Sequence, residues 1–90
     1  MFEWDETKRK ENLRKHGIDF ADAAELFEGP VLSELDNRFP YGEARYVAYG
    51  ILRDFVVAVA YTPRGDATRI ISMRKATAHE QKEFFKKISH

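Results

Sequence analysis

The sequence contains no cysteine, which excludes a disulfide framework and any metal site built on thiolates. It has no long apolar run, so it holds no candidate membrane span. Its first ten residues, MFEWDETKRK, lack the apolar stretch that follows the positive charge of a secretory signal. These three absences fit a protein of the cytoplasm, and we expect that location.

The sequence also lacks a net charge, because 15 Lys and Arg residues balance 15 Asp and Glu residues. Overall neutrality argues against a protein that coats nucleic acid, which would be basic throughout. The charges are unevenly distributed, however: residues 1–43 hold 11 acids and 6 bases, and residues 44–90 hold 4 acids and 9 bases. A basic half can form a local phosphate site. The alternative is that the two halves interleave in space and their charges cancel.

Motifs for cofactor and metal chemistry are missing as well. There is no P-loop, no G-x-G-x-x-G pattern and no H-E-x-x-H pattern, and the histidines (His16, His79 and His90) are scattered. No G-x-S-x-G element marks a serine nucleophile. We therefore expect no cofactor and no metal ion.

The first third of the chain predicts a short strand and two helices. Residues 2–4 alternate between apolar and polar side chains, as an edge strand does. Asp5 should cap a helix that ends at His16, and Asp19 should cap a second helix through about Phe27.

After the second helix the apolar period changes to two, which predicts strands. The expected strands are residues 31–35, 45–52, 55–62 and 67–75. The third of them, FVVAVAYT, is apolar on both faces and should be the central strand. Arg53-Asp54 should form a two-residue hairpin loop, and residues 63–66 a tight turn.

A third helix should begin at Thr77, where T-x-x-E forms a capping box, and should dock Phe84, Phe85 and Ile88 on the sheet. We thus expect one domain over residues 1–90 with an α+β fold. Its sheet should be a four-stranded antiparallel meander with a short N-terminal strand added, and two N-terminal helices and one C-terminal helix should pack around it.

The stretch from Thr62 to Lys75 carries the clearest sign of function. It delivers Arg69, Arg74 and Lys75 to a strand that ends beside the helix start at Thr77. Guanidinium groups and the free N–H groups of a helix start both suit phosphate. The alternative, to which these residues alone give equal weight, is a hairpin whose outer face is charged.

The chain offers cations and hydroxyl groups but no marked nucleophile of its own. RNA supplies a nucleophile, the 2′-hydroxyl group. Cleavage by that route needs in-line geometry, a proton acceptor, a proton donor and positive charge near the phosphate. A cluster of Arg, Lys and His side chains provides these without a metal. The candidates are Lys15, His16, Arg45, Tyr49, Tyr61, Arg69, Arg74, Lys75 and His79.

Each candidate has a structural alternative. Lys15 and His16 stand where cations complement a helix C-terminus. Arg45 can pair with a neighbouring acid across strands. Residues such as Tyr49 and Tyr61 are more often half-buried sheet residues than proton donors. Arg74 is the strongest candidate, because it lies at a strand end just before a helix cap.

Three segments stand out in order: FEWDETKRKENLRKHGIDFADAAELF, YGEARYVAYG and VVAVAYTPRGDATRIISMRKAT. Together they resemble the BrnT family of toxin–antitoxin ribonucleases, from Phe2 to about Glu83. The resemblance implies a RelE-like fold and an endoribonuclease activity that stops translation. It also implies a BrnA-like antitoxin, with two toxins on an antitoxin dimer. The site residues that it implies are Lys15, His16, Arg45, Arg69, Arg74 and Lys75.

Our hypothesis is a metal-independent endoribonuclease. Arg74 and Arg45 would hold the scissile phosphate, and His16 or Lys15 would move protons. Tyr61 would stack a base. The catalytic set is Lys15, His16, Arg45, Arg74 and Lys75, and the substrate-binding set is Arg69, Tyr61 and Arg64. The rival hypothesis is a non-catalytic binding module whose basic face meets an acidic antitoxin segment or DNA.

Overall fold

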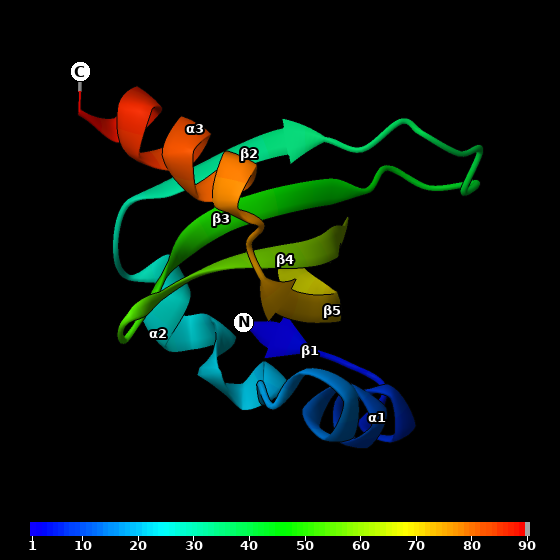
Figure 1. Ribbon diagram of the computed structural model, residues 1–90. Coiled ribbons are helices and arrows are strands. Elements are labelled where there is room, and N and C mark those ends of the chain that lie inside the picture. The colour runs from blue at the N-terminus through cyan, green and yellow to red at the C-terminus, as the bar shows by residue number, and fades with distance from the viewer. Residues whose placement is uncertain (90) are drawn as a thin grey trace.

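The computed structural model of the protein describes residues 1–89, and His90 lies outside the described residues. Three α-helices and one 3-10 helix pack around a sheet of five strands (Figure 1). In chain order the elements are β1 (Phe2–Glu3), α1 (Glu6–His16), the 3-10 helix η1 (Phe20–Asp22), α2 (Ala23–Phe27), β2 (Val31–Leu35), β3 (Tyr46–Leu52), β4 (Phe55–Arg64), β5 (Ala67–Lys75) and α3 (Ala78–Ile88). None of the helices among residues 1–89 is long and apolar enough to cross a membrane.

The sheet has the order β1-β5-β4-β3-β2. Strands β2 to β5 pair antiparallel in succession, whereas β1 pairs parallel to β5 through Phe2↔Thr68 and Glu3↔Arg69. The predicted α+β class is thus confirmed, but the sheet is five-stranded and mixed rather than a purely antiparallel meander. The short strand β1 lies beside β5 at the edge of the sheet, and α1 follows it along the same edge (Figure 1).

The central strand was correctly predicted. Strand β4 lies in the middle of the sheet, and its residues Val56, Val57, Ala58 and Val59 are all buried. It runs two residues further than expected, to Arg64, so the turn that follows is centred on Gly65. Gly65 has a φ of 57°, a conformation that costs glycine little. Arg53-Asp54 forms the expected two-residue connection between β3 and β4.

Helices cover the two faces of the sheet unequally (Figure 1). On the first face, which we call the core face, η1 and α2 bury Phe20, Ala23 and Leu26 against β3, β4 and β5. On the second face, which we call the α3 face, helix α3 packs Phe84 and Ile88 beside Val56. Because α3 covers one end of this face, the remainder carries half-buried side chains that partners can reach.

Helix α1 begins and ends as predicted. The Asp5 carboxylate accepts a hydrogen bond from the Lys8 amide, and Gly17 ends the helix at a φ of 71°. The helix buries only Asn12. That side chain donates to the carbonyl oxygens of Ile18 (3.0 Å) and Met73 (2.9 Å) and accepts from the Met73 amide (3.1 Å). Asn12 therefore acts as one residue of an extra strand and fastens α1 to the edge of β5.

The second predicted helix is only partly correct. Asp19 caps it as expected, by accepting from the Ala21 amide, but residues 20–22 form a 3-10 turn before the five-residue helix α2. The apolar stripe of this segment must bury Phe20, Ala23 and Leu26 together against the sheet. A tighter first turn changes the direction of these side chains, and residue spacing alone does not reveal it.

Helix α3 has the predicted capping box, in which Thr77 and Glu80 satisfy each other's backbone amides. Phe84 docks on the sheet as expected and is 2% exposed. The expectation for Phe85 is wrong, because its side chain is 47% exposed. Adjacent residues of a helix point about 100° apart, so Phe84 and Phe85 cannot both face the sheet.

Candidate functional site

Four arginine side chains belong to one face of the sheet. Arg74 pairs with Ala58 and Arg69 pairs with Thr62, and residues two apart on β4 point to the same side. Arg64 continues that row, and alternation along β3 gives Arg45 the same side. We call this part of the α3 face the arginine face, and its residues are Arg45, Arg64, Arg69 and Arg74.

A β-bulge makes this arrangement possible. In a regular strand Arg69 and Arg74, five residues apart, would point to opposite faces. The pairing of β4 with β5 shifts between Ala60 and Tyr61, and Ile71 is the extra residue on β5. The bulge restores both arginines to the same face, as bulges commonly do where a side chain is re-aimed.

Each of these arginines is held by a carboxylate. Glu43 accepts from Arg45 (3.3 Å) and from Arg64 (3.4 Å), and Glu3 of β1 accepts from Arg69 (2.9 Å). The Arg45 guanidinium also lies 4.1 Å from the centre of the Tyr41 ring, in a cation–π contact. The acids fix the direction of the guanidinium groups and cancel part of their charge.

The Arg74 side chain is the most firmly held. It donates two hydrogen bonds to the Glu80 carboxylate, at 2.7 and 3.0 Å, in a bidentate fork. The Tyr49 hydroxyl donates to the same carboxylate at 3.1 Å. The Arg74 guanidinium, with help from the Thr77 amide and Tyr49, holds the pKa of Glu80 at about 2, against the opposing effect of burial.

The same contacts determine the charge states of Arg74 and Tyr49. Glu80 raises the pKa of Arg74, which therefore stays a cation. Burial, together with the Glu80 charge, raises the pKa of the Tyr49 phenol. Tyr49 is consequently a neutral hydroxyl group at physiological pH, able to donate a proton but not to accept one as a phenolate.

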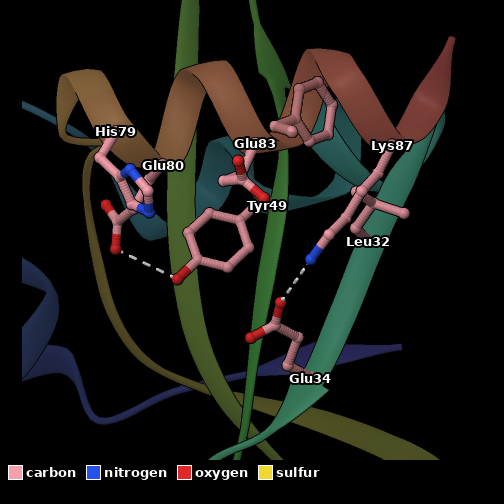
Figure 2. Close-up of a pocket in the computed structure, with 8 residues that line it drawn as sticks. Leu32, Glu34, Tyr49, His79, Glu80, Glu83 and Lys87 are labelled. Carbon is pink, nitrogen blue, oxygen red and sulfur yellow. Dashed lines mark hydrogen bonds and ion pairs between the residues drawn. The ribbon is translucent and has the colours of Figure 1, made fainter.

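A cleft of about 310 Å³ opens beside Arg74 and Tyr49. Its far wall is the β2–β3 connection, where Arg38 donates two hydrogen bonds to Asp36 and lowers the pKa of Asp36 to about 2. A second cleft, of about 350 Å³, lies under α3 (Figure 2). Tyr49 and Glu80 line both, and across the second cleft Lys87 pairs with Glu34 at 3.5 Å.

Lys15 and His16 lie on the last turn of α1, apart from the Arg74 cleft. Both line a groove of about 270 Å³ between α1 and the edge of β5, with Ile71 and Ser72 as its other wall. Asn12 holds α1 against β5 through its three hydrogen bonds to Ile18 and Met73, and so fixes the width of this groove. The groove therefore meets the edge of the arginine face at the bulge.

Two further candidates point to the core face instead. Lys75 pairs with Val57, and its ammonium lies 4.1 Å from the centre of the Phe55 ring. Tyr61 stacks on Tyr46 with ring centres 5.5 Å apart and donates to the Ser33 hydroxyl at 3.1 Å. The eight residues of the catalytic and substrate-binding sets thus fall into three groups: the four arginines, the pair at the end of α1, and the pair on the core face.

Glu80 is a site residue that the sequence pattern did not identify as such. Its T-x-x-E spacing predicted the capping role, but the same carboxylate also receives Arg74 and Tyr49 from two strands. Within residues 1–89, no group of three or more His, Asp or Glu side chains is arranged to hold a metal ion.

Comparison with known proteins identifies one family. The family model described as "Ribonuclease toxin, BrnT, of type II toxin-antitoxin system" matches residues 4–80, which include all eight residues of the catalytic and substrate-binding sets. A comparison with curated proteins finds no match to the chain.

Proposed function

The chain belongs to the BrnT family of ribonuclease toxins of type II toxin–antitoxin systems, and we propose that it cleaves RNA by attack of the ribose 2′-oxygen on the neighbouring phosphate. The observation that supports this most is the arginine face, where four guanidinium groups are directed by carboxylates toward one side of the sheet. A single strand of RNA laid across this face would find a cation for successive phosphates.

The proposed reaction forms one bond to phosphorus and breaks one, and one proton is removed while another is donated. The 2′-hydroxyl group gives its proton to a base on the protein, and its oxygen forms a bond to phosphorus. The bond from phosphorus to the 5′-oxygen breaks, and that oxygen receives a proton from an acid. The products are a 2′,3′-cyclic phosphate and a 5′-hydroxyl end. No metal ion takes part in these steps.

Arg74 would stabilise the charge that develops on the phosphate in the transition state. Its fork is already oriented by Glu80, so little reorganisation is needed when the phosphate arrives. Glu80 stays ionised and acts through Arg74, as a positioning residue. Arg45, Arg64 and Arg69 would hold the flanking phosphates.

Three groups are suited to the proton transfers. His16 and Lys15 line the groove that meets the arginine face, and histidine changes charge near neutral pH. Tyr49 is a neutral hydroxyl group within the Arg74 cluster and is suited to donate the proton that the leaving oxygen needs. Lys75 stays in the proposed set, although it points to the other face of the sheet from Arg74.

The test is a cleavage assay with purified protein and EDTA, on a ribose strand and the same strand with 2′-deoxy sugars. Only the ribose strand should be cut. Arg74→Ala should reduce the rate on the order of 100-fold, the effect of removing one transition-state donor. The matched control is Arg14→Ala, since Arg14 is an exposed arginine paired with Glu11 on α1. A folded Arg74→Ala protein with full activity would refute the assignment.

We further propose that a BrnA-like antitoxin neutralises the protein in the cytoplasm by covering the arginine face, with two toxins on an antitoxin dimer. An acidic segment could replace the carboxylates that now pair with the arginines. Co-purification and the mass of the complex in solution would test this. Without the antitoxin, the protein would inhibit translation by cleaving RNA.

The second candidate function is a binding module without catalysis. It is favoured by the pairing of all four arginines with Glu3, Glu43 or Glu80, which reduces the charge available to a transition state. A binder would retain the ribose strand without shortening it. The EDTA assay, followed by a translation extract, separates the two functions.

A further inference from the structure

The core face carries a cleft that shares His16 and Lys75 with the proposed catalytic set but lies on the other side of the sheet from Arg74. It has a volume of about 310 Å³ and lies between the end of α1 and the β3–β4 connection. Pockets for small molecules begin at about this size. Its lining includes Phe55, two cations (Arg53 and Lys75), the imidazole of His16 and two acids (Asp22 and Asp54).

Phe55 is the first unusual feature of this cleft. It begins the most buried strand of the sheet, yet its side chain is 51% exposed. The Lys75 ammonium lies over the ring, 4.1 Å from its centre. An exposed aromatic ring beside a cation is the combination with which proteins hold a nucleotide of a single strand, since the ring stacks on the base and the cation meets the phosphate.

Arg53 is the second unusual feature. It has a φ of 55°, in the left-handed region that disfavours a side chain, at a loop position where glycine or asparagine is usual. Strained positions of this kind cluster at ligand sites. Arg53 pairs with Asp22 at 3.3 Å and Glu25 at 3.5 Å, so its charge is held at the rim of the cleft.

The cleft is close to the arginine face although it opens on the other side of the sheet. Arg74 and Lys75 are consecutive residues of β5 and point to opposite faces. His16 lines both this cleft and the groove between α1 and β5. A strand of RNA that crosses the edge of β5 beside α1 would therefore pass from Arg74 to Lys75.

We propose that this cleft binds one nucleotide of the single-stranded RNA substrate, with its base stacked on Phe55 and its phosphate on Lys75 and His16. The inference rests on the proposed function for the identity of the RNA as substrate. The base takes the place of the Lys75 ammonium over the ring, and the flexible lysine chain moves the ammonium to the phosphate. Asp54, at the cleft wall, is an acceptor for the amino group of a base.

The experiment measures binding separately from cleavage. The probe is a short, labelled 2′-O-methyl oligoribonucleotide, which has no free 2′-hydroxyl group to attack. Fluorescence anisotropy gives its dissociation constant for the wild type and for Phe55→Ala, Phe55→Tyr and Phe85→Ala. Phe85 is the matched control, because its ring is 47% exposed but lies on α3.

Phe55→Ala should weaken binding by about tenfold, as the loss of one stacked base does. Phe55→Tyr should stay within about twofold of the wild type, since the ring is kept, and Phe85→Ala should be unchanged. A probe that carries 5-iodouracil should cross-link to Phe55 on irradiation, as peptide mapping would reveal. Unfolding curves of each variant check that the fold is intact.

Equal affinity of Phe55→Ala and wild type, or no binding of the probe to the wild type, would overturn the inference. If the wild type nevertheless cleaves RNA, the proposed function stands without it. If Phe55→Ala weakens probe binding as expected but the wild type cuts no RNA, the nucleotide site stands and the proposed cleavage fails. If Phe55→Ala loses affinity for an acidic peptide but not for the probe, the cleft is a protein contact and the RNA assignment is wrong.

Discussion

The ion pair between Arg74 and Glu80 makes a prediction about stability that is independent of catalysis. Replacing Glu80 with Gln removes the charge but keeps the size of the side chain. In the wild type the pKa of Glu80 falls from its ordinary value of 4.5 to about 2. At about 1.4 kcal/mol per pH unit, this difference corresponds to about 3 kcal/mol. Because the pair is partly exposed, screening by solvent reduces the contribution to about 1–2 kcal/mol.

The sign of the pH dependence follows from the direction of the change. A carboxyl group whose pKa is lowered by folding stabilises the protein fully above pH 4.5. Its contribution decreases as the pH falls toward 2, because the unfolded chain then binds the proton first. The free energy of unfolding of Glu80→Gln should therefore be about 1–2 kcal/mol lower than that of the wild type at pH 7, and this difference should shrink toward pH 2.

Urea unfolding at pH 7, 4.5 and 3 measures both effects. The matched control is Glu83→Gln, one turn further along α3. Its free energy of unfolding at pH 7 should lie within about 0.5 kcal/mol of the wild-type value. The reasoning is refuted if Glu80→Gln and the wild type have the same free energy of unfolding at pH 7, or if their difference does not depend on pH.

Four further substitutions test the packing that positions the candidate site. Asn12→Ala should lower the free energy of unfolding by about 2–4 kcal/mol in chemical denaturation, because it leaves the Met73 amide and two carbonyl groups without their buried partner. Phe84→Ala should lower the free energy of unfolding by about 3–5 kcal/mol, whereas Phe85→Ala should lower it by less than about 1 kcal/mol; similar losses would contradict the observed burial. Gly50→Ala should lower the melting temperature, since the new Cβ would lie 2.6 Å from a methyl carbon of the buried Leu26, and this overpacking costs about 1–3 kcal/mol.

The local signals in the sequence predicted the elements well. Asp5 and Thr77 begin helices, and Gly17 ends one, because each of these side chains or conformations satisfies backbone groups within a few residues. The central strand was predictable because β4 is apolar on both faces. The parallel pairing of β1 was not predictable, since it joins residues at opposite ends of the sequence and no local signal marks it.

The placement of Arg74 and Lys75 on opposite faces was predictable from the sequence. Arg74 and Lys75 are neighbours in one strand, so the period of two already places them on opposite faces. The bulge at Ile71 is a different case, since pairing in the folded sheet creates it and residue types do not reveal it. Without it, Arg69 would leave the face on which Arg74 lies.

The opposite charges of the two halves of the chain prove to interleave in space. Arg45 and Arg64 from the basic half pair with Glu43, and Arg69 pairs with Glu3. Arg53 and Lys87 likewise pair with acids from the first 43 residues. The basic half is thus not a free positive surface, which explains how a neutral protein can carry arginines on one face.

This interleaving bears on the phosphate binding that we propose for the arginine face. Each guanidinium of the arginine face is oriented before the ligand arrives, and a phosphate gains most where it can share the cation rather than displace the acid. Arg74 differs from the others, because both terminal nitrogens donate to Glu80 and a third group, Tyr49, donates to the same acid. A carboxylate held by several donors leaves slowly, which favours one orientation for Arg74, whereas Arg45 and Arg64 share the single carboxylate of Glu43. Fixed geometry is required where a bond breaks, and adaptable cations suffice where a backbone is only held. This difference in ion pairing is the reason why we propose Arg74 for the centre of the reaction and the other arginines for the flanking phosphates.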